Sequence, residues 1–427
     1  MAASTNYARL REQTMGSQFD EEAVTVNTRA LIDKVLARYS GEWTTLRELI
    51  QNAADAQATR VTIRFETNPS ANVPLPQSQS QSDHLKHVLL HHTLKTLMVS
   101  NNGETFAETD WQRLKRIAEG NPDETKIGAF GVGFYSVFAD CESPFVSSGN
   151  QNMAFYWKKD SLFTRRGKLP DDQATKDTTF LLDYRSSSTP VPGLLSLCQF
   201  LATSLTFVGL ECIELYLDDW NILKLTKKMA PGANISLPKD VNPKTKDGLM
   251  KITAVEYQNA QIDAQWMNVV GWNRQQAVAA NIMGNQAPAE NGGSLRSWFS
   301  KLAGGVNTVN TAAKKAQKEE EALQLAIAED LTGYSNATVF LRISTVNVQT
   351  YVGRTLAQEL ERATKKPPPK HTRIAILTSS YDETSASMST VSGAGSKRAS
   401  DIFASVLPTK NGKIFIGFPT AHRQQVC

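Results

Sequence analysis

One face of a predicted helix at Thr44–Gln57 carries side chains suited to holding a metal ion. Glu48, Asn52 and Asp55 lie at positions i, i+4 and i+7, so a helix brings two carboxylates and one amide onto the same stripe. The opposite side is apolar and is formed by Leu46, Leu49, Ile50 and Ala53. Because hard divalent cations prefer oxygen ligands, this spacing predicts a face that holds a hydrated cation.

A glycine-rich segment, residues 126–136, suggests a second kind of chemistry. Gly128, Gly131 and Gly133 let the backbone approach a ligand closely. A helix that starts directly afterwards, at Phe134–Phe138, would direct amide groups and the positive end of its dipole toward phosphate. The Gly-x-x-Gly-x-Gly pattern alone also fits a tight turn, so the phosphate interpretation depends on the carboxylate-bearing helix before it.

Polar residues also mark the ends of predicted strands. A buried strand at Leu94–Ser100 delivers Asn101, Asn102 and Gly103 at its end, where they are well placed to meet a ligand. Thr178 begins another strand, and it either contacts the ligand or simply favours strand structure. A histidine cluster could hold a metal, but ordinary exposed histidines are the preferred interpretation, because no cysteine or carboxylate set accompanies the cluster. Its members are His84, His87, His91 and His92.

The remaining elements of the first half are predicted to position these residues. A helix capped by Asn27 has a buried stripe that includes Leu31, Val35 and Tyr39. Residues 68–82 are low in complexity and are expected to form a surface loop. The other expected elements are a strand at 60–66, a helix at 106–119, a hairpin at 152–159 and 161–166, a strand at 178–185 and a helix at 191–207.

Composition limits the class of protein. The chain has 427 residues and a formal net charge of +4, and no long basic stripe interleaved with aromatic residues supports nucleic-acid binding. Its four cysteines show neither metal-ligand nor disulfide-framework spacing, which favours a cytoplasmic location, with the nucleus as the other reducing compartment. Residues 191–210 are the most membrane-like stretch, but they include hydroxyl and amide side chains and are expected to form a buried helix.

The second half of the chain changes to a strand-rich pattern. Strands are expected at 212–217, 222–226, 250–257, 338–349, 373–378 and 413–418. Residues 286–331 resemble an insertion, in which a helix face at 295–302 either packs on its own domain or contacts a partner or a membrane surface. Residues 365–370 and 384–400 are expected to be linkers, and residues 1–20 a mobile leader.

Three separated motifs occur in the order typical of a known family. The Glu48-x-x-x-Asn52-x-x-Asp55 pattern, a strand that ends in an Asn-Gly turn, and the glycine-rich segment resemble the GHKL (Bergerat-fold) ATPases, most closely the branch of sacsin and the heat-shock chaperones. The resemblance implies an α/β fold with a two-layer, Bergerat-type ATPase domain at residues 21–210. A partial α+β transducer-like domain would follow at residues 211–427. Because a family transducer continues further, a truncated product is expected.

The resemblance also implies a site for ATP and Mg²⁺. Glu48 would be the general base that orients the attacking water, and Asn52 would bind the Mg²⁺ that bridges the phosphates. Asp55 would support the adenine side, and Lys126 would meet phosphate from the end of a lid at residues 104–128. The other residues implied to contact ATP are Asn101, Gly103, Gly128, Phe130, Gly131, Val132, Gly133, Phe134 and Thr178.

One position departs from the family pattern. Asn101 stands where the family usually has an aspartate that accepts a hydrogen bond from the adenine amino group. An asparagine oxygen can accept this bond, but without the charge that strengthens it. The second glycine of the same turn is also missing. Weaker nucleotide affinity or relaxed selectivity for adenine is therefore expected.

These features predict slow, magnesium-dependent ATP hydrolysis that drives lid closure in a chaperone-like protein. Expected partners are protein clients, a partner chain or a second copy in a homodimer. The alternative is a non-hydrolysing nucleotide sensor or scaffold that recruits partners, which Asn101 favours and Glu48 argues against. Histidine kinase activity is disfavoured, because no phosphoacceptor-helix pattern precedes the ATPase domain.

Overall fold

The computed structural model describes residues 26–37, 41–116, 133–170, 172, 174–272, 330–364, 367–378, 402–404, 406, 411–416 and 418–425. The helices are α2 (Thr28–Leu36), α3 (Thr44–Asp55), α4 (Gln81–His91), α5 (Glu108–Arg113), α6 (Leu194–Phe207) and α10 (Arg354–Thr364), with 3-10 helices η1 (Phe134–Ala139) and η3 (Asn268–Gly271). The strands are β1 (Arg60–Asn68), β2 (Thr93–Asn101), β3 (Phe145–Ser148), β4 (Gln151–Lys158), β5 (Ser161–Lys168), β6 (Thr178–Asp183), β7 (Cys212–Leu217), β8 (Trp220–Met229), β9 (Ala233–Ile235), β10 (Met250–Met267), β11 (Tyr334–Thr350), β12 (His371–Thr378), β13 (Asn411–Ile416) and β14 (Phe418–Gln425).

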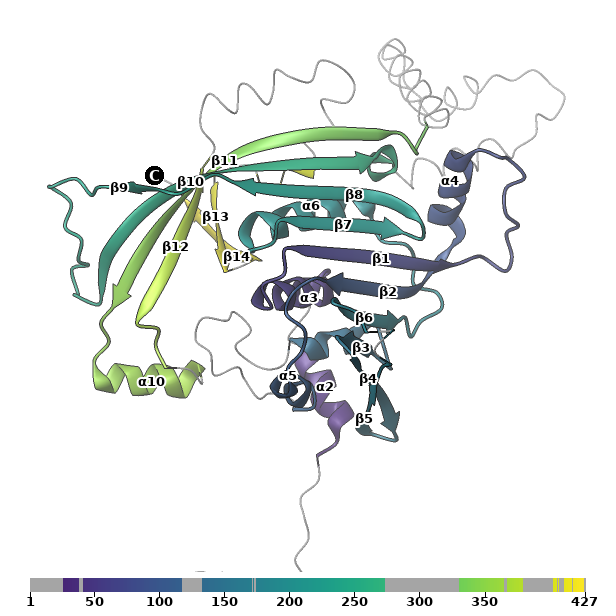
Figure 1. The fold of residues 1–427 in the computed structure, drawn as a ribbon, viewed down its shortest axis with the longest axis horizontal. Helices are drawn as coiled ribbons and strands as arrows, with labels where there is room; N and C mark the ends of the chain where they lie inside the picture. Colours follow the sequence, from purple (N-terminus) through teal and green to yellow (C-terminus); the bar gives the residue numbers. More distant parts are fainter. Residues whose placement is uncertain are drawn as a thin grey trace, which may run out of the picture.

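One large sheet dominates the described part of the chain (Figure 1). Its strand order is β12-β11-β10-β8-β7-β1-β2-β6-β3-β4-β5, and β9 pairs with β10. A separate hairpin is formed by β13 and β14. Most neighbours are antiparallel, but β7 pairs with β1 in parallel. The fold is therefore mixed α/β, as the sequence predicted, and one sheet dominates it.

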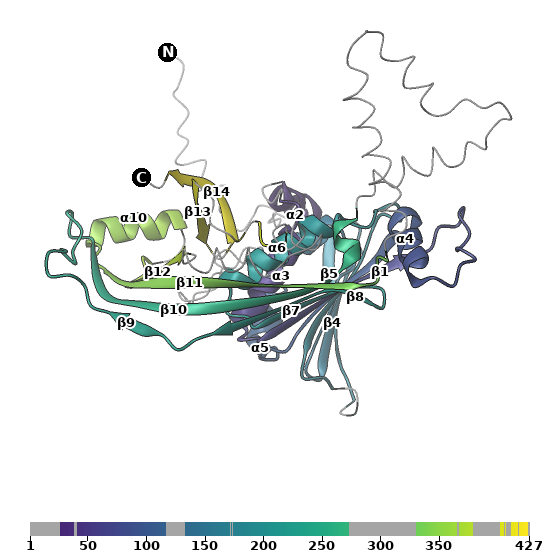
Figure 2. The same cartoon turned by 90° about the horizontal axis from the view of Figure 1, so that it is seen from above.

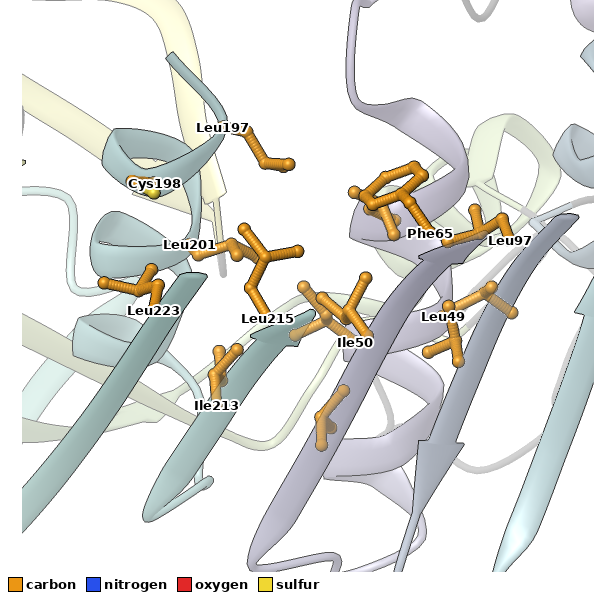
Figure 3. Packing of buried hydrophobic residues seen from close by; sticks show 14 of the residues in the cluster. Leu49, Ile50, Phe65, Leu97, Leu197, Cys198, Leu201, Ile213, Leu215 and Leu223 are labelled. Atoms are coloured by element: carbon orange, nitrogen blue, oxygen red, sulfur yellow. The ribbon is translucent and has the colours of Figure 1, made fainter. Parts of the chain in front are cut away.

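The main hydrophobic core lies between the centre of the sheet and the helices α3 and α6. In β1, Val61, Ile63 and Phe65 are buried and alternate with more exposed residues, the period that a half-buried strand requires. In Figure 3, apolar side chains of α3 and α6 gather with those of β1, β2, β7 and β8. The labelled residues are Leu49, Ile50, Phe65, Leu97, Leu197, Cys198, Leu201, Ile213, Leu215 and Leu223. This packing holds α3 in place, and α3 carries the candidate catalytic residue.

Helix α6 confirms that residues 191–210 contain a buried helix. It has 14 residues and packs on β7 and β8. Its buried hydroxyl groups bond to carbonyl oxygens one turn earlier: Thr203 to Gln199 at 2.9 Å, Ser204 to Phe200 at 2.8 Å and Thr206 to Ala202 at 2.8 Å. These bonds remove the cost of burying polar groups. None of the helices within the described ranges is long and apolar enough to cross a membrane.

The sheet continues without interruption across the predicted domain boundary near residue 210. Strand β7, on the far side of that position, pairs in parallel with β1 from Arg60↔Cys212 to Phe65↔Leu217. Strand β8 then pairs with β7, and β10 with β8. The division into two domains stays a prediction, but the structure places strands from both predicted domains side by side.

Strands β10 and β11 are much longer than predicted. The sequence indicated strands at 250–257 and 338–349, whereas the structure has 18 and 17 residues. The second half of β10 alternates buried Ala260, Ile262, Ala264 and Trp266 with more exposed residues, but its alanines and glutamines are weak strand formers and concealed this period. The first half of β10 and the second half of β11, which pair with each other, extend past α3 and α6 toward α10 (Figure 2).

Two further differences concern the polar parts of the first half. The predicted loop at 68–82 ends at Ser80, because the Ser80 hydroxyl caps α4 by accepting from the backbone amide of Asp83 at 3.4 Å. The helix predicted at 106–119 spans only Glu108–Arg113 among the described residues. The expected leader, most of the insertion at 286–331 with its helix face at 295–302, and the expected linker at 384–400 lie outside the described residues.

Candidate functional site

Helix α3 presents the predicted polar stripe on the side away from the core. Leu49 and Ile50 are 1% and 0% exposed, whereas Glu48 and Asp55 are half-buried and Asn52 is exposed. The Thr45 hydroxyl donates to the backbone oxygen of Ser136 at 3.2 Å, which ties α3 to η1. Packing of the apolar side thus fixes how the stripe faces Gly133, the residue directly before η1.

Glu48 lies directly against Gly133, the last glycine of that segment. A Cβ atom at position 133 would overlap Glu48 Oε2 and lie 3.0 Å from Glu48 Cδ. Gly133 has a φ of −57° and a ψ of −45°, a conformation open to any residue. It is therefore the space beside Glu48, and not the backbone conformation, that requires glycine here. The structure brings two motifs 85 positions apart in the sequence into contact.

Burial alters the acid strength of this carboxyl group. Desolvation raises the pKa of Glu48 above its ordinary value, and the neighbouring Arg47 guanidinium opposes the shift. A raised pKa brings a carboxylate closer to the strength that suits a general base at neutral pH. The environment of Glu48 is thus consistent with the role that the sequence predicted.

The turn after β2 is fastened to the C-terminal end of α3. The backbone amide of Glu104 donates to the Ala56 carbonyl oxygen at 2.8 Å. A Cβ atom at Gly103 would lie 2.6 Å from the same oxygen, so this close approach requires glycine. The amide of Gly103 donates to Asn101 Oδ1 at 3.1 Å. The predicted residues Asn101 and Gly103 therefore form one turn beside α3.

Three buried polar side chains form a row across the ends of three strands. Asn101 pairs with Thr178 between β2 and β6, and Thr178 pairs with Ser148 between β6 and β3. These side chains are 5%, 2% and 2% exposed. The oxygens of Ser148 and Thr178 are 2.6 Å apart, and the amide of Phe106 donates to Ser148 Oγ at 2.9 Å. The row places Thr178 beside Asn101.

Ser148 received no role from the sequence, although its place at the end of β3 is the same signal that identified Asn101. Asn102 was predicted to be well placed to meet a ligand, but its side chain bonds within the protein. Its Oδ1 accepts from the amides of Thr59 and Arg60 at 3.0 and 2.8 Å, and its Nδ2 donates to the Thr59 hydroxyl at 2.9 Å. Asn102 thus anchors the turn to the start of β1.

The two groups of residues lie at different heights along α3. Glu48 and Gly133 meet in its first half, and the Asn101 turn contacts Ala56 beyond its last residue. A helix rises about 1.5 Å per residue, so Glu48 and Ala56 are separated by roughly 12 Å along the axis. An extended nucleoside triphosphate can bridge such a distance. The arrangement is that of an elongated site with a carboxylate at one end and a polar turn at the other.

Some of the residues predicted to contact the nucleotide lie outside the described residues or in the core. Lys126, Gly128, Phe130, Gly131 and Val132 lie outside the described residues. Phe134 is 8% exposed, and its ring centroid lies 5.2 Å from that of Phe155 and 6.3 Å from that of Phe180, so its ring is part of the core. The nucleotide and metal contacts of the predicted residues stay predictions.

The histidine cluster lies on and next to α4. His87 and His92 are buried, contrary to the expected exposure, and their ring centroids are 5.4 Å apart. His92 Nδ1 bonds to the Thr67 hydroxyl at 2.7 Å, and that hydroxyl donates to Asp218 at 2.8 Å. Within the described ranges, no group of three or more His, Cys, Asp or Glu side chains is arranged to hold a metal ion. Of the four histidines, His87 and His92 are thus part of the packed interior.

Comparison with curated proteins supports the resemblance stated above. The chain is 32% identical to human sacsin over 119 residues, which are 27% of this chain and 2% of sacsin. It is 33% identical over 135 residues to an endoplasmin homolog of Dictyostelium discoideum, covering 29% of this chain and 17% of the relative. It is 33% identical over 152 residues to the chaperone protein HtpG of Methylorubrum extorquens, covering 30% and 23%. The chain thus spans less than a quarter of each relative, and its similarity to sacsin and to these chaperones is confirmed.

Two family models match different parts of the chain. The sacsin domain model matches residues 25–167, which contain α3, the Asn101 turn and Gly133. The second model matches residues 205–424, from the end of α6 through nearly all of the remaining sequence. Because this match covers more than half of the 427 residues, the chain belongs to the family described as protein of unknown function (DUF3684).

Proposed function

We propose that this protein binds ATP with Mg²⁺ and hydrolyses it slowly, and that nucleotide binding drives a chaperone-like conformational change. The contact between Glu48 and Gly133 carries the proposal, because it joins a carboxylate of raised pKa to the end of a glycine-rich segment. The relatives support the same assignment, since HtpG is by name a chaperone. In this proposal the domain at residues 21–210 is a Bergerat-type ATPase, and the chain beyond it is transducer-like.

The residues of α3 suit the two tasks that hydrolysis requires. Asn52 is exposed on the polar stripe, and its amide oxygen is a ligand that suits Mg²⁺, which would neutralise phosphate charge when bound. Glu48, one turn earlier, would orient a water molecule and take its proton. Asp55, Asn101, Gly103 and Thr178 would hold the base, about 12 Å from Glu48 by the helical rise. Segment 104–128 would close over the nucleotide.

Calorimetric titration of Mg²⁺-ATP into the full chain tests the binding step. Wild-type protein should bind, and Asn52→Ala should lose most of the affinity, because the mutation removes a metal ligand. Asn234→Ala on β9 is the matched control, since Asn234 is exposed and lies on an element remote from α3. No binding by folded wild-type protein would refute the proposal.

Phosphate release tests the chemical step. Glu48→Gln should bind Mg²⁺-ATP with near wild-type affinity but hydrolyse it at least about 100-fold more slowly, since general-base catalysis contributes about this much. Glu359→Gln on α10 provides a control with the same chemical change at an exposed position. Equal rates for Glu48→Gln and wild-type protein would remove Glu48 from the mechanism.

A non-hydrolysing nucleotide sensor is the second candidate. Asn101 favours it, because this residue lacks the carboxylate charge and its Oδ1 already accepts from Gly103. The two candidates differ in one measurement: a sensor binds Mg²⁺-ATP, changes its pattern of amide exchange, and releases no phosphate. In that case Glu48→Gln would alter neither binding nor exchange.

A further inference from the structure

The hydrogen bond within the Asn101 turn shows which side of the Asn101 amide is the oxygen Oδ1 and which is the nitrogen Nδ2. The backbone amide of Gly103 can only donate, and it lies 3.1 Å from Asn101 Oδ1. The atom that receives this bond must be an oxygen, because the Nδ2 group has hydrogens and cannot accept. The carbonyl end of Asn101 therefore faces Gly103, and the Nδ2 group occupies the other side.

The Nδ2 group of Asn101 has no acceptor among the described residues. The side chain is 5% exposed, and its hydrogen bond within the described ranges is the one from Gly103. The neighbouring hydroxyl of Thr178 bonds to Ser148 at 2.6 Å and makes no hydrogen bond with Asn101 among the described residues. The Nδ2 atom is not one of the fully buried, unpaired polar atoms of the described residues, so its hydrogens can reach an acceptor in a ligand or in water.

We infer that Asn101 is a selectivity residue that presents a hydrogen-bond donor to the base and removes selection for a 6-amino purine. The inference rests on the proposed function, in which the base lies at this turn. A carboxylate at position 101 could accept from both Gly103 and a 6-amino group. In Asn101, Oδ1 is held by the Gly103 amide and Nδ2 is the group left for a ligand, so the purine edge that faces it must accept. A carbonyl at position 6 of the purine can accept from Nδ2. A 6-amino group cannot, because it and Nδ2 are both hydrogen-bond donors.

Inosine triphosphate and ATP provide the test, because a carbonyl replaces the amino group at position 6. Calorimetric titration of each Mg²⁺ complex into the full wild-type chain should show that inosine triphosphate binds at least as tightly as ATP. Asn101→Asp keeps the acceptor for Gly103 and replaces the outward donor by an acceptor. The ratio of the two affinities should then shift toward ATP by about tenfold or more, the effect of one matched against one mismatched hydrogen bond.

Asn102→Asp is the matched control. It makes the same chemical change one residue along, where Oδ1 accepts from Thr59 and Arg60, and it should leave the affinity ratio unchanged. Tighter binding of ATP than of inosine triphosphate by tenfold in wild-type protein overturns the inference, whether or not Asn101→Asp folds. An unchanged ratio in folded Asn101→Asp also overturns it. Binding of neither nucleotide refutes the proposed function, and the inference with it.

Discussion

Replacement of Gly133 by alanine separates the stability of the fold from the placement of Glu48. All three atoms nearest to a Cβ at this position belong to Glu48, and the closest is Oε2. The far end of a glutamate side chain can rotate, so the added methyl group should displace the carboxylate rather than the backbone. The φ of −57° is one that alanine adopts without strain.

The expected change in stability is small because two effects oppose each other. Forcing Glu48 from its preferred rotamer costs about 0.5–1.5 kcal/mol. Replacing glycine by alanine in an allowed conformation stabilises the folded state by about 0.4–1 kcal/mol, because the unfolded chain loses conformational freedom. The free energy of unfolding of Gly133→Ala should therefore lie within about 1 kcal/mol of the wild-type value.

Catalysis should respond much more strongly than stability. A misplacement of about 1 Å in a catalytic group can cost about 100-fold in rate, so Gly133→Ala should release phosphate about 100-fold more slowly. Urea unfolding and phosphate release, measured on the same preparation, give both quantities. Gly209→Ala is the control, because no heavy atom lies within 4 Å of a Cβ there.

A double mutant decides whether Glu48 is the group that Gly133 protects. In a Glu48→Ala background, adding Gly133→Ala should no longer cost rotamer energy, so the glycine replacement should be neutral or stabilising. A loss of more than about 3 kcal/mol in Gly133→Ala, a value beyond the rotamer cost, would show that the backbone itself is displaced. A wild-type rate of phosphate release in Gly133→Ala would refute the placement of Glu48.

Three further predictions follow from buried polar groups. Because burial raises the pKa of Glu48, the stability that protonated Glu48 contributes is present below its ordinary pKa of 4.5 and is lost as the pH rises through the raised pKa. In urea unfolding, Glu48→Gln should therefore be more stable than wild-type protein at pH 8 but not near pH 4. An equal difference in the free energy of unfolding at both pH values would contradict this. Lys227 Nζ donates to two carbonyl oxygens at the end of α6, at 2.8 and 2.5 Å. Lys227→Met should therefore lower the free energy of unfolding by about 2–5 kcal/mol. A loss below about 1 kcal/mol would show that water replaces the amine. Ser148→Ala should speed hydrogen exchange of the Phe106 amide, and unchanged exchange would exclude this bond in solution.

The sequence was most informative where local rules decide the structure. Asn27 was predicted to cap a helix, and its Oδ1 accepts from the amide of Ala30 at 2.9 Å. The apolar spacing of Leu46, Leu49 and Ile50 predicted the buried side of α3, and the alternation in β1 predicted its burial pattern. Each signal depends only on residues within a few positions of one another.

The sequence was least informative about contacts between distant segments. The parallel pairing of β7 with β1 leaves no mark on the local period of either strand. The contact of Glu48 with Gly133 could be expected only through the family resemblance, because spacing along the chain does not specify it. The orientation of the Asn101 amide needed the position of the Gly103 amide, which only coordinates provide.

Because β10 is long, a small bend in it would move the far part of the sheet a large distance. Pairing of β10 with β8 is confined to Ala260–Trp266, so residues 250–259 project beyond this seam while still paired with β9 and β11. Ten residues at about 3.3 Å each give an arm of roughly 33 Å. A bend of about 10° in β10 where its pairing with β8 ends would move the tip by roughly 6 Å, by the same rise per residue. Main-chain hydrogen bonds connect β10 to β1 through β8 and β7, so a small bend at this place in the sheet would become a large displacement at the tip of the arm.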